Sequence, residues 1–212
     1  MGALKGVRVL DFSRVLAGPY CTMILADLGA EVIKVERPKK GDLSRDSVPF
    51  VNGQSAYFIS VNRGKKSITL DLQDPEGKNI AARLADQSDI IVENFRPGVM
   101  DRLGLGAETL RKRNPRLIYA SITGFGQSGP YANRPAYDLI LQSMGGLMGI
   151  TGEQGREPVR AGYSIGDLAA SVWASVGILT ALYDREREGV GQVLDLSMLD
   201  SQVAFCENAI AR

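Results

Sequence analysis

The chain has 212 residues, of which 44% are hydrophobic and 23% are charged, and this balance is typical of a globular domain with a sizeable core. Its formal net charge of +1 provides no general electrostatic attraction to nucleic acid or to an anionic membrane. The chain has no histidine, which excludes a Ser/His/Asp triad, a Cys/His pair and histidine-ligated zinc and leaves such chemistry to carboxylates, Lys, Tyr or Cys.

Short apolar runs rich in β-branched residues alternate with segments of helical spacing. The first unit reads "GVRVLDFS", "PYCTMILADLGA" and "EVIKVERP". The expected strands are residues 6–13, 31–37, 66–72, 88–94, 116–122 and 192–198. The expected helices are residues 19–29, 74–87, 107–115 and about 168–188, with a final helical segment from about residue 197. Helices between buried strands predict an α/β fold with a Rossmann-like, doubly wound and mostly parallel sheet.

Residues 124–162 interrupt this alternation because they are rich in Gly, Pro and polar side chains. They surround one apolar segment, "YDLILQSMGGLMGI". We expect loops and a short helix here, and loops at strand ends are where sites are built.

Cellular context is predicted from the cysteines and from the apolar runs. Cys21 and Cys206 lie among apolar residues, where a cysteine behaves as a small core side chain. The first apolar stretch is too short for a signal peptide, and no later run approaches the roughly 18 apolar residues of a membrane span without Gly or charge. We therefore expect a soluble, cytoplasmic protein with no membrane or nucleic-acid partner.

Nucleotide motifs are weak in this chain. A dinucleotide site needs G-x-G-x-x-G directly after the first strand, where this sequence reads "SRVLAGPY", and no G-x-x-x-x-G-K-[ST] is present. Basic residues nevertheless follow the expected strands, as phosphate ligands would in an open α/β sheet, although a solvated basic edge explains them equally well. They are Arg37, Lys39, Lys40, Arg63, Lys65, Lys66, Arg96 and Arg102.

One carboxylate stands at the head of a long apolar run. Asp167 follows Ser164 and Gly166, and no other charge occurs until Asp184. This is the position of a helix N-cap, whose side chain accepts a backbone N–H. Alternatively, the helix dipole keeps the carboxylate ionised while the glycine leaves it reachable, so that it acts as a covalent nucleophile. The residues alone leave both roles open.

A series of motifs, taken together, resembles the class III CoA-transferases, the family of formyl-CoA transferase and carnitine CoA-transferase. The motifs are "LDFSRVLAGPYCTMILADLGAEVIKVERP", "NRGKKSITLDL", "PEGK", "VENFRPGVMDRLGL", "YASITGFGQSGP", "YDLILQ" and "GDLAAS". They occur in the family's order and spacing from Gly6 to about Ser201. The resemblance therefore covers nearly the whole chain.

The resemblance implies a site as well as a fold. The family's nucleophile lies in the motif that reads "IGDLAAS" here, which makes Asp167 the expected catalytic residue. The expected coenzyme A contacts are Val15, Ala17, Arg37, Leu70, Asn94, Phe95 and Arg102, with Tyr137 near the thioester. The family mechanism passes through aspartyl mixed anhydrides and an aspartyl-CoA thioester, with acyl-CoA and a small, in some cases dicarboxylic, acid as substrates and no metal.

Two departures from the family pattern bear on this expectation. Formyl-CoA transferase has a Gln where this chain has Leu16, which argues against oxalate and formate as substrates. Family members also continue into a smaller domain and a glycine-rich loop, and they form homodimers of interlocked chains. Residues 1–212 therefore correspond to the amino-terminal part of the CoA-binding large domain, with the segment from about 197 leading toward the smaller domain.

Three other functions remain open at this point. A non-catalytic CoA-binding module would lack acyl exchange. An α-methylacyl-CoA racemase needs two bases and carries a His where this chain has Tyr137, so that a His-free chain disfavours it. A nucleotide-dependent oxidoreductase is the least favoured, because its glycine motif is absent.

Overall fold

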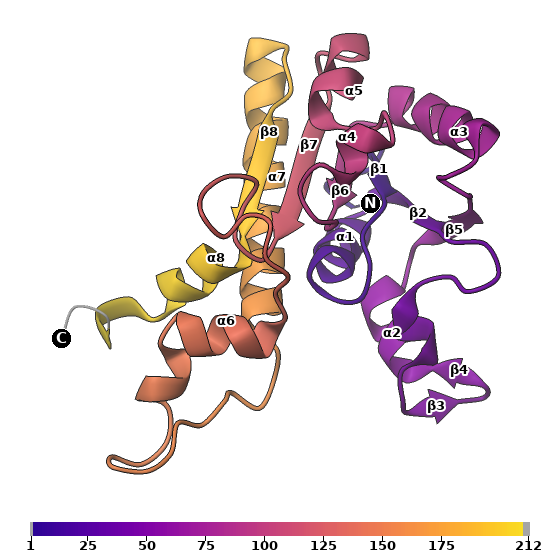
Figure 1. The fold of residues 1–212 in the computed structure, drawn as a ribbon. Coiled ribbons are helices and arrows are strands. Elements are labelled where there is room, and N and C mark those ends of the chain that lie inside the picture. Colours follow the sequence, from indigo (N-terminus) through magenta and orange to yellow (C-terminus); the bar gives the residue numbers. More distant parts are fainter. Residues whose placement is uncertain (1, 210–212) are drawn as a thin grey trace.

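Six parallel strands form the central sheet of the computed structural model, which describes residues 2–209 (Figure 1). The strands are β1 (Arg8–Asp11), β2 (Glu31–Glu36), β5 (Lys66–Thr69), β6 (Ile90–Glu93), β7 (Ile118–Thr123) and β8 (Val193–Ser197). They lie in the order β5-β2-β1-β6-β7-β8, and every neighbouring pair is parallel. All six expected strands are confirmed, although most are shorter than expected. The chain winds outward from β1 to one edge and from β6 to the other, which is the doubly wound arrangement.

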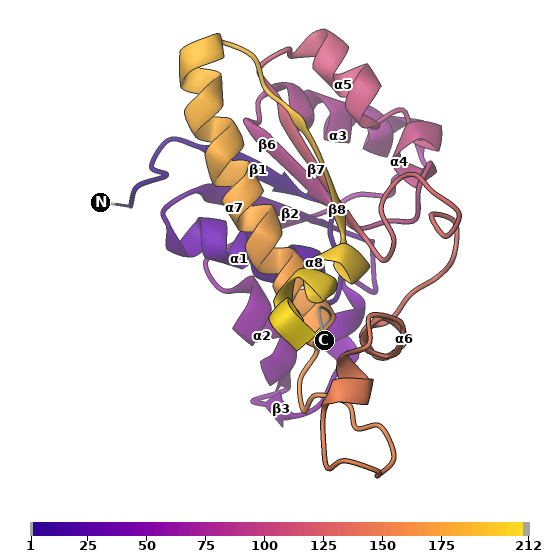
Figure 2. The ribbon, with the colours of Figure 1, turned by 90° about the vertical axis from the view of Figure 1, so that its left-hand side faces the viewer.

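Helices cover both faces of this sheet. They are α1 (Ala17–Asp27), α2 (Ala56–Asn62), α3 (Pro75–Asp86), α4 (Val99–Arg102), α5 (Ala107–Arg113), α6 (Asp138–Met144), α7 (Ile165–Glu188) and α8 (Met198–Phe205). Figure 2 shows α7 running across the face that it shares with α1. The opposite face is covered by α3, α4 and α5. The layered α/β fold predicted from the sequence is therefore confirmed.

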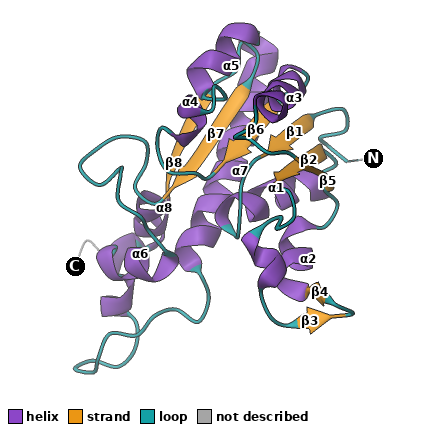
Figure 3. Cartoon of the chain, turned by 45° about the vertical axis from the view of Figure 1, so that its right-hand side comes forward, coloured by secondary structure: helices purple, strands orange, loops and turns teal. Residues whose placement is uncertain are grey.

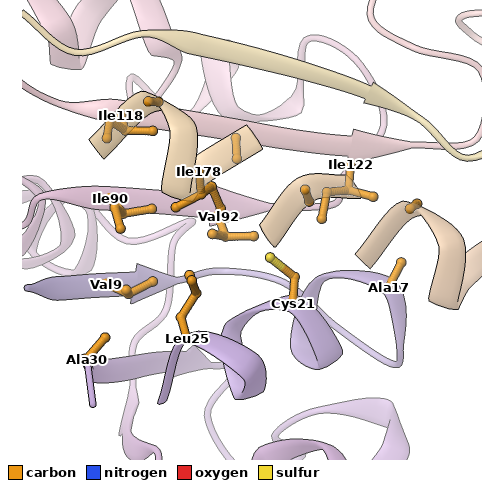
Figure 4. Close-up of a cluster of buried hydrophobic side chains, with 14 of the residues drawn as sticks. Val9, Ala17, Cys21, Leu25, Ala30, Ile90, Val92, Ile118, Ile122 and Ile178 are labelled. Carbon is orange, nitrogen blue, oxygen red and sulfur yellow. The ribbon is translucent and has the colours of Figure 1, made fainter. Parts of the chain in front are cut away.

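The strand residues alternate between two hydrophobic cores. Val9 and Ile90 face α1 and α7, whereas their neighbours Leu10 and Ile91 face α3 and α5. Figure 4 shows the first core, in which Ile178 of α7 packs between the strands and α1. Side chains of a strand point alternately to opposite faces, so strands covered on both sides read as continuous apolar runs.

The long helix α7 lies close to α1 because small residues line their contact. Ser171 Oγ donates a 2.6 Å hydrogen bond to the carbonyl oxygen of Ala17, and Ser175 Oγ lies 3.4 Å from Cys21 Sγ. Burial raises the pKa of the Cys21 thiol to about 12, and Cys206 is also buried. Both cysteines therefore occupy the core, as expected.

The helix α7 is long and apolar by mean hydropathy, although Asp167, Gly177 and Asp184 interrupt its apolar run. This helix has 24 residues and a mean hydropathy of 1.6 over its most apolar 18-residue window, which is long and apolar enough to cross a membrane. Half of that window is buried inside the protein, however, and a core helix passes the same test. One side of α7 is apolar because Ala170, Ala174 and Ile178 pack against the sheet and α1.

Several short elements were not predicted. They are the hairpin β3 (Phe50–Val51) and β4 (Gln54–Ser55), α2, α4 and three 3-10 turns, η1 (Leu43–Asp46), η2 (Leu147–Ile150) and η3 (Glu207–Ala209). Figure 3 shows the hairpin and α2 at the lower end of the molecule, on the opposite side from α6 and its loop. Elements of two to seven residues contain too few positions for a hydrophobic period to emerge. The final residues of the expected carboxy-terminal helical segment, 210–212, lie outside the described residues.

Close packing at the start of α1 can be tested at Gly18. A Cβ atom at this position would stand 2.1 Å from the Cβ atom of Ser13, whereas one at Gly149 would meet nothing within 4 Å. We expect Gly18→Ala to lower the free energy of unfolding by about 1–3 kcal/mol through overpacking. Gly149→Ala should change it by less than about 0.5 kcal/mol. Urea unfolding of both variants measures the difference, and equal stabilities would contradict the close contact.

Candidate active site

The carboxyl ends of β1 and β6 mark the point at which the winding of the sheet reverses. In open α/β sheets, ligands bind in the crevice that forms at this point. The loops that leave the two strands are joined through Asn94, whose Oδ1 accepts the Arg14 N–H at 2.8 Å and whose Nδ2 donates to the Arg14 carbonyl oxygen at 2.8 Å. Asn94 therefore fixes the backbone of the first loop, a role beyond the ligand contact expected of it.

A cavity of about 390 Å³ lies above these strand ends. Loops after β1, β6 and β7 line it, together with the first turns of α6 and α7. Among the residues expected at the site, it brings together Val15, Ala17, Asn94, Phe95, Tyr137 and Asp167. Tyr137 is 79% exposed and precedes α6 directly. The sequence prediction of one shared site at these positions agrees with this geometry.

Asp167 does not cap its own helix. It is the third residue of α7, whose N-cap position is held by Ser164 without a side-chain hydrogen bond. The capping bond comes instead from Asp138 of α6, whose Oδ1 accepts the Gly166 N–H at 2.7 Å. Asp138 Oδ2 accepts a hydrogen bond from Gln142. The expectation that Asp167 is the N-cap is therefore wrong, because a residue distant in sequence supplies the cap and leaves the Asp167 side chain free.

The environment of Asp167 favours its protonated form. Burial and the neighbouring Asp138 carboxylate raise the pKa of Asp167 to about 7, and a hydrogen bond from the Ala17 backbone N–H offsets only part of this rise. The prediction that the helix terminus keeps the carboxylate ionised is wrong in direction. A helix N-terminus contributes about 0.3–1 kcal/mol, which is less than the cost of ionising a carboxyl beside a second carboxylate in a cavity.

A second cavity, of about 90 Å³, adjoins the first. Of the expected site residues, Arg37, Leu70 and Phe95 line it, and Arg14 and Phe95 line both cavities. The Arg14 guanidinium lies 4.5 Å from the centroid of the Phe95 ring. The two cavities therefore form adjoining parts of one site, with Arg14 and Phe95 at the boundary.

Two arginines, Arg14 and Arg37, line the smaller cavity together with Asp71 and with Glu36, whose carboxylate is paired with Arg45. Burial and the Arg37 charge lower the pKa of Arg14, although Asp42 opposes this. Arg37 Nε is buried and has no hydrogen-bond partner in the part of the chain that the structure describes. Two guanidinium groups that repel each other, one with an unpaired buried donor, suit a ligand that carries phosphate.

The other basic residues that follow the strands differ in position and in pairing. Arg96 lines the larger cavity, whereas Arg102 is exposed and lines neither cavity, so its expected CoA contact stays a prediction. Lys65 is only 2% exposed and pairs with Asp11 at 3.1 Å, so it is neither a phosphate ligand nor a solvated edge. Arg63 and Lys66 pair with acidic residues at the surface, and Lys39 and Lys40 are exposed. Within residues 2–209, no group of three or more acidic or Cys side chains is placed to hold a metal ion.

Sequence reasoning missed Arg14, Arg134 and Asp138, all of which line the larger cavity. A local signal existed for Asp138, because an acidic residue at the start of a short apolar helix often supplies a cap. Its partner lies 28 residues further along the chain, however, and no local pattern reveals that pairing.

Glu93 is a second buried carboxyl near the site, at the end of β6. Burial raises the pKa of Glu93 to about 7, although hydrogen bonds with Ser121 and with the Phe95 N–H oppose the rise. The Phe95 N–H donates to Glu93 Oε2 at 2.8 Å, which shapes the turn that presents Asn94 and Phe95. Glu93 lines neither cavity.

Comparison with known proteins agrees with the sequence resemblance. The profile of a family described as CoA-transferase family III matches residues 4–212. The succinyl-CoA:mesaconate CoA-transferase of Haloarcula hispanica is 49% identical over 219 residues, covering 99% of this chain and 55% of that protein. The acetyl-CoA:oxalate CoA-transferase of Acetobacter aceti is 50% identical over 210 residues, covering 99% and 54%.

A solved structure also resembles this chain, in fold as well as in sequence. The crystal structure of a CAIB/BAIF family protein from Brucella suis superposes with a TM-score of 0.95 at 43% identity, covering 99% of this chain and 57% of that one. The chain thus spans about half the length of the curated relatives that it matches.

The raised pKa of Asp167 predicts a pH-dependent gain in stability for Asp167→Asn. Between its ordinary pKa of 3.8 and about 7, the folded chain keeps a proton on Asp167 that the unfolded chain has released. The free energy of unfolding of the parent chain therefore falls as the pH rises through this window. We expect Asp167→Asn to be more stable at pH 8 by on the order of 2 kcal/mol, a figure discounted for partial exposure.

Urea unfolding at pH 5 and pH 8 measures this effect. The gain should be much smaller at pH 5, where Asp167 is already protonated in the folded state. Glu93→Gln is the comparison variant. Its stability gain should also be larger at pH 8 than at pH 5, because the pKa of Glu93 is likewise raised to about 7, although its side chain lies outside both cavities. A gain for Asp167→Asn that is equal at the two pH values would contradict the raised pKa.

Proposed function

The chain belongs to CoA-transferase family III, and on that premise we propose that it carries the nucleophile and the coenzyme A site of an enzyme that transfers coenzyme A from an acyl-CoA to a carboxylic acid. The observation that carries this proposal is the placement of Asp167 in a cavity that adjoins an arginine-lined one. Coenzyme A is a long molecule with a phosphorylated nucleotide at one end and a thiol at the other. Two adjoining cavities, one that contains two arginines and one that contains Asp167, suit those two ends.

The residues present fit the ligand at each end. Arg14 and Arg37 supply guanidinium donors for phosphates, and Arg37 Nε offers a buried donor without a partner among the described residues. Leu70 and Phe95 provide apolar surface for the adenine ring. The thiol end then reaches past Arg14 and Phe95 toward Asp167.

The proposed reaction begins with the ionised Asp167 carboxylate. One of its oxygens attacks the thioester carbonyl carbon, the carbon–sulfur bond breaks, and the coenzyme A thiolate leaves an aspartyl mixed anhydride behind. The thiolate attacks the Asp167 carbonyl carbon of this anhydride and releases the donor acid, so that an aspartyl-CoA thioester forms. The energy of the activated acyl bond is thereby preserved.

The acceptor acid completes the exchange. Its carboxylate attacks the Asp167 carbonyl carbon, expels the thiolate and forms a second mixed anhydride. The thiolate then attacks the acceptor's carbonyl carbon, which yields the new acyl-CoA and returns Asp167 as a carboxylate. Water must be kept from the anhydrides, because hydrolysis would waste the activated acyl group.

The acids that the enzyme uses are proposed only as a class. The relatives described above are named for mesaconate and for oxalate, which are both small dicarboxylic acids. Arg96 and Arg134 line the larger cavity and place further positive charge near Asp167. We therefore propose a small dicarboxylic acid as one substrate. Leu16 argues against oxalate, whereas a relative that is 50% identical carries oxalate in its name, so oxalate is kept within the proposed class.

The racemase alternative is less well supported by the site. A racemase needs two bases, and Asp138 is the other acidic residue that lines the larger cavity with Asp167. Both Asp138 oxygens accept hydrogen bonds, from the Gly166 N–H and from Gln142, so this carboxylate serves as a cap rather than a free base.

The covalent mechanism predicts a trappable adduct on Asp167. The longest natural chain that contains these residues is incubated with succinyl-CoA, acetyl-CoA and other acyl-CoAs and then treated with hydroxylamine. We expect a hydroxamate on the peptide that contains Asp167, detected by mass spectrometry, and none in Asp167→Ala. No adduct with any acyl-CoA, despite measurable CoA binding, would favour a non-catalytic CoA-binding protein instead.

The rate of adduct formation should depend on pH through Asp167. Only the ionised carboxylate attacks, so the single-turnover rate should rise with pH and level off above about pH 7. Asp138→Asn removes the neighbouring negative charge while keeping an oxygen for the Gly166 N–H, and we expect it to move this rise to lower pH. Glu93→Gln serves as the control. A rise that moves in Glu93→Gln but not in Asp138→Asn would identify Glu93 as the titrating group.

A further inference from the structure

A lysine lies buried in the strand next to the site. Lys34 of β2 has a side chain that is 1% exposed, and its Nζ donates a 2.8 Å hydrogen bond to the Ser13 carbonyl oxygen. Its counter-ion is Asp42, whose Oδ2 lies 2.9 Å away and whose side chain is also 1% exposed. A buried charge pair of this kind requires well-placed partners, because both ions have lost their water.

Both carboxylate oxygens of Asp42 accept hydrogen bonds, and the donors come from two segments of the chain. The Ser44 N–H donates to its Oδ1 at 2.9 Å, and the Ser44 hydroxyl donates at 2.8 Å. The Val15 N–H donates to the two oxygens at 3.2 and 3.3 Å. Burial disfavours the carboxylate, but the charge and hydrogen bond of Lys34 still hold the pKa of Asp42 below its ordinary value. Asp42 therefore joins the turn after β2 to the loop after β1.

The bond to Val15 matters because of the backbone at that residue. Val15 has a φ of 65°, in the left-handed region that a β-branched side chain rarely adopts. Such a conformation persists only where the surroundings hold it in place. Two residues later stands Ala17, which lines the larger cavity with Asp167, and Ser171 Oγ joins the two segments because it lies within hydrogen-bond distance of both carbonyl oxygens, at 2.6 and 2.7 Å. The direction of the Ala17 N–H at this junction depends on the turn at Val15.

We propose that Asp42, with Lys34 as its counter-ion, is a positioning residue for the nucleophile, because it holds Val15 in the left-handed turn that aims the Ala17 amide at Asp167. Asp42 lines neither cavity and acts through the first loop. The inference rests on the proposed transferase function, since its effect is measured on the reaction of Asp167.

The test neutralises both charges together. Lys34→Met/Asp42→Asn removes the pair but leaves an amide oxygen that can accept the Val15 N–H. Lys34→Met/Asp42→Ala removes the same charges and the acceptor as well. Both variants have the same net charge as the parent chain, and a buried ion pair replaced as a whole is often tolerated, so both should fold. Thermal unfolding and circular dichroism check this before any kinetic measurement.

The readouts are the single-turnover rate of adduct formation and its pH dependence, measured on the longest natural chain. The groups that face Asp167 are Asp138 from α6, Tyr57 from α2 and the Ala17 amide from α1, and only the last should differ between the two double variants. We expect the Ala double variant to form the adduct at least tenfold more slowly at pH 6.5. Its rate should also rise at a pH that is up to about one unit higher, the effect of losing one hydrogen bond to a carboxylate. The Asn double variant should stay within about threefold of the parent chain.

The outcomes separate the two proposals. Failure of the parent chain to form any adduct overturns the proposed function. A parent chain that forms the adduct, together with two folded double variants of equal rate and equal pH dependence, overturns only the positioning role. If the Ala double variant does not fold, Val15→Gly is compared with the parent chain in amide hydrogen exchange, because glycine adopts the turn without help. Lys34→Met/Asp42→Leu, which removes the same charges and the acceptor, is introduced into both backgrounds. Protection of the Ala17 amide should fall in the parent background only, and unchanged protection there would overturn the role.

Discussion

The site depends on burying two Lys–Asp pairs at the carboxyl ends of the first two strands. Asp11 ends β1 and accepts hydrogen bonds from Ser13, Thr22 and Lys65, and Lys34 joins Asp42 to the loop that follows. Against the burial that disfavours a charge, the nearby Lys65 and Lys34 charges and these hydrogen bonds lower the pKa of Asp11 to about 2. A buried pair of this kind adds little net stability, but losing one partner costs about 3–5 kcal/mol. The pairs therefore restrict the first loop to one conformation more than they stabilise the fold.

The same electrostatic logic explains why Asp167 differs from Asp11 and Asp42. All three carboxyls are largely withdrawn from water, but Asp11 and Asp42 have lysine partners, whereas the charge that shifts the pKa of Asp167 is the carboxylate of Asp138. Burial without a counter-ion raises the pKa, and burial with one lowers it. The buried lysines thus pair with carboxylates around the first loop, and Asp167 itself has no lysine partner among residues 2–209. Such a local cost in stability is common where activity requires it.

The fold could be read from the sequence because its signals are local. Each buried strand is a short apolar run, and Gly29 and Pro38 mark the ends of a helix and a strand. The position of Asp167 followed from the resemblance, and the structure places it in the larger cavity with Val15, Ala17 and Tyr137. Pairings across the sequence could not be read in this way. Lys65 looked like a surface cation because nothing near it reveals Asp11, which is 54 residues away and lies on another strand.

In the proposed reaction, Asp167 serves in turn as nucleophile and as leaving group, and a pKa near 7 suits both roles. An aspartate with an ordinary pKa of 3.8 would be fully ionised at pH 7 but would be a weaker nucleophile toward a thioester. An aspartate with a pKa far above 7 would attack well but would seldom be ionised. At about 7, roughly half of the Asp167 side chains are ionised at neutral pH, while basicity is raised well above that of an ordinary carboxylate. The Ala17 amide limits this rise, so in the proposed reaction the turn at Val15 adjusts the balance between the fraction ionised and the reactivity of each ion.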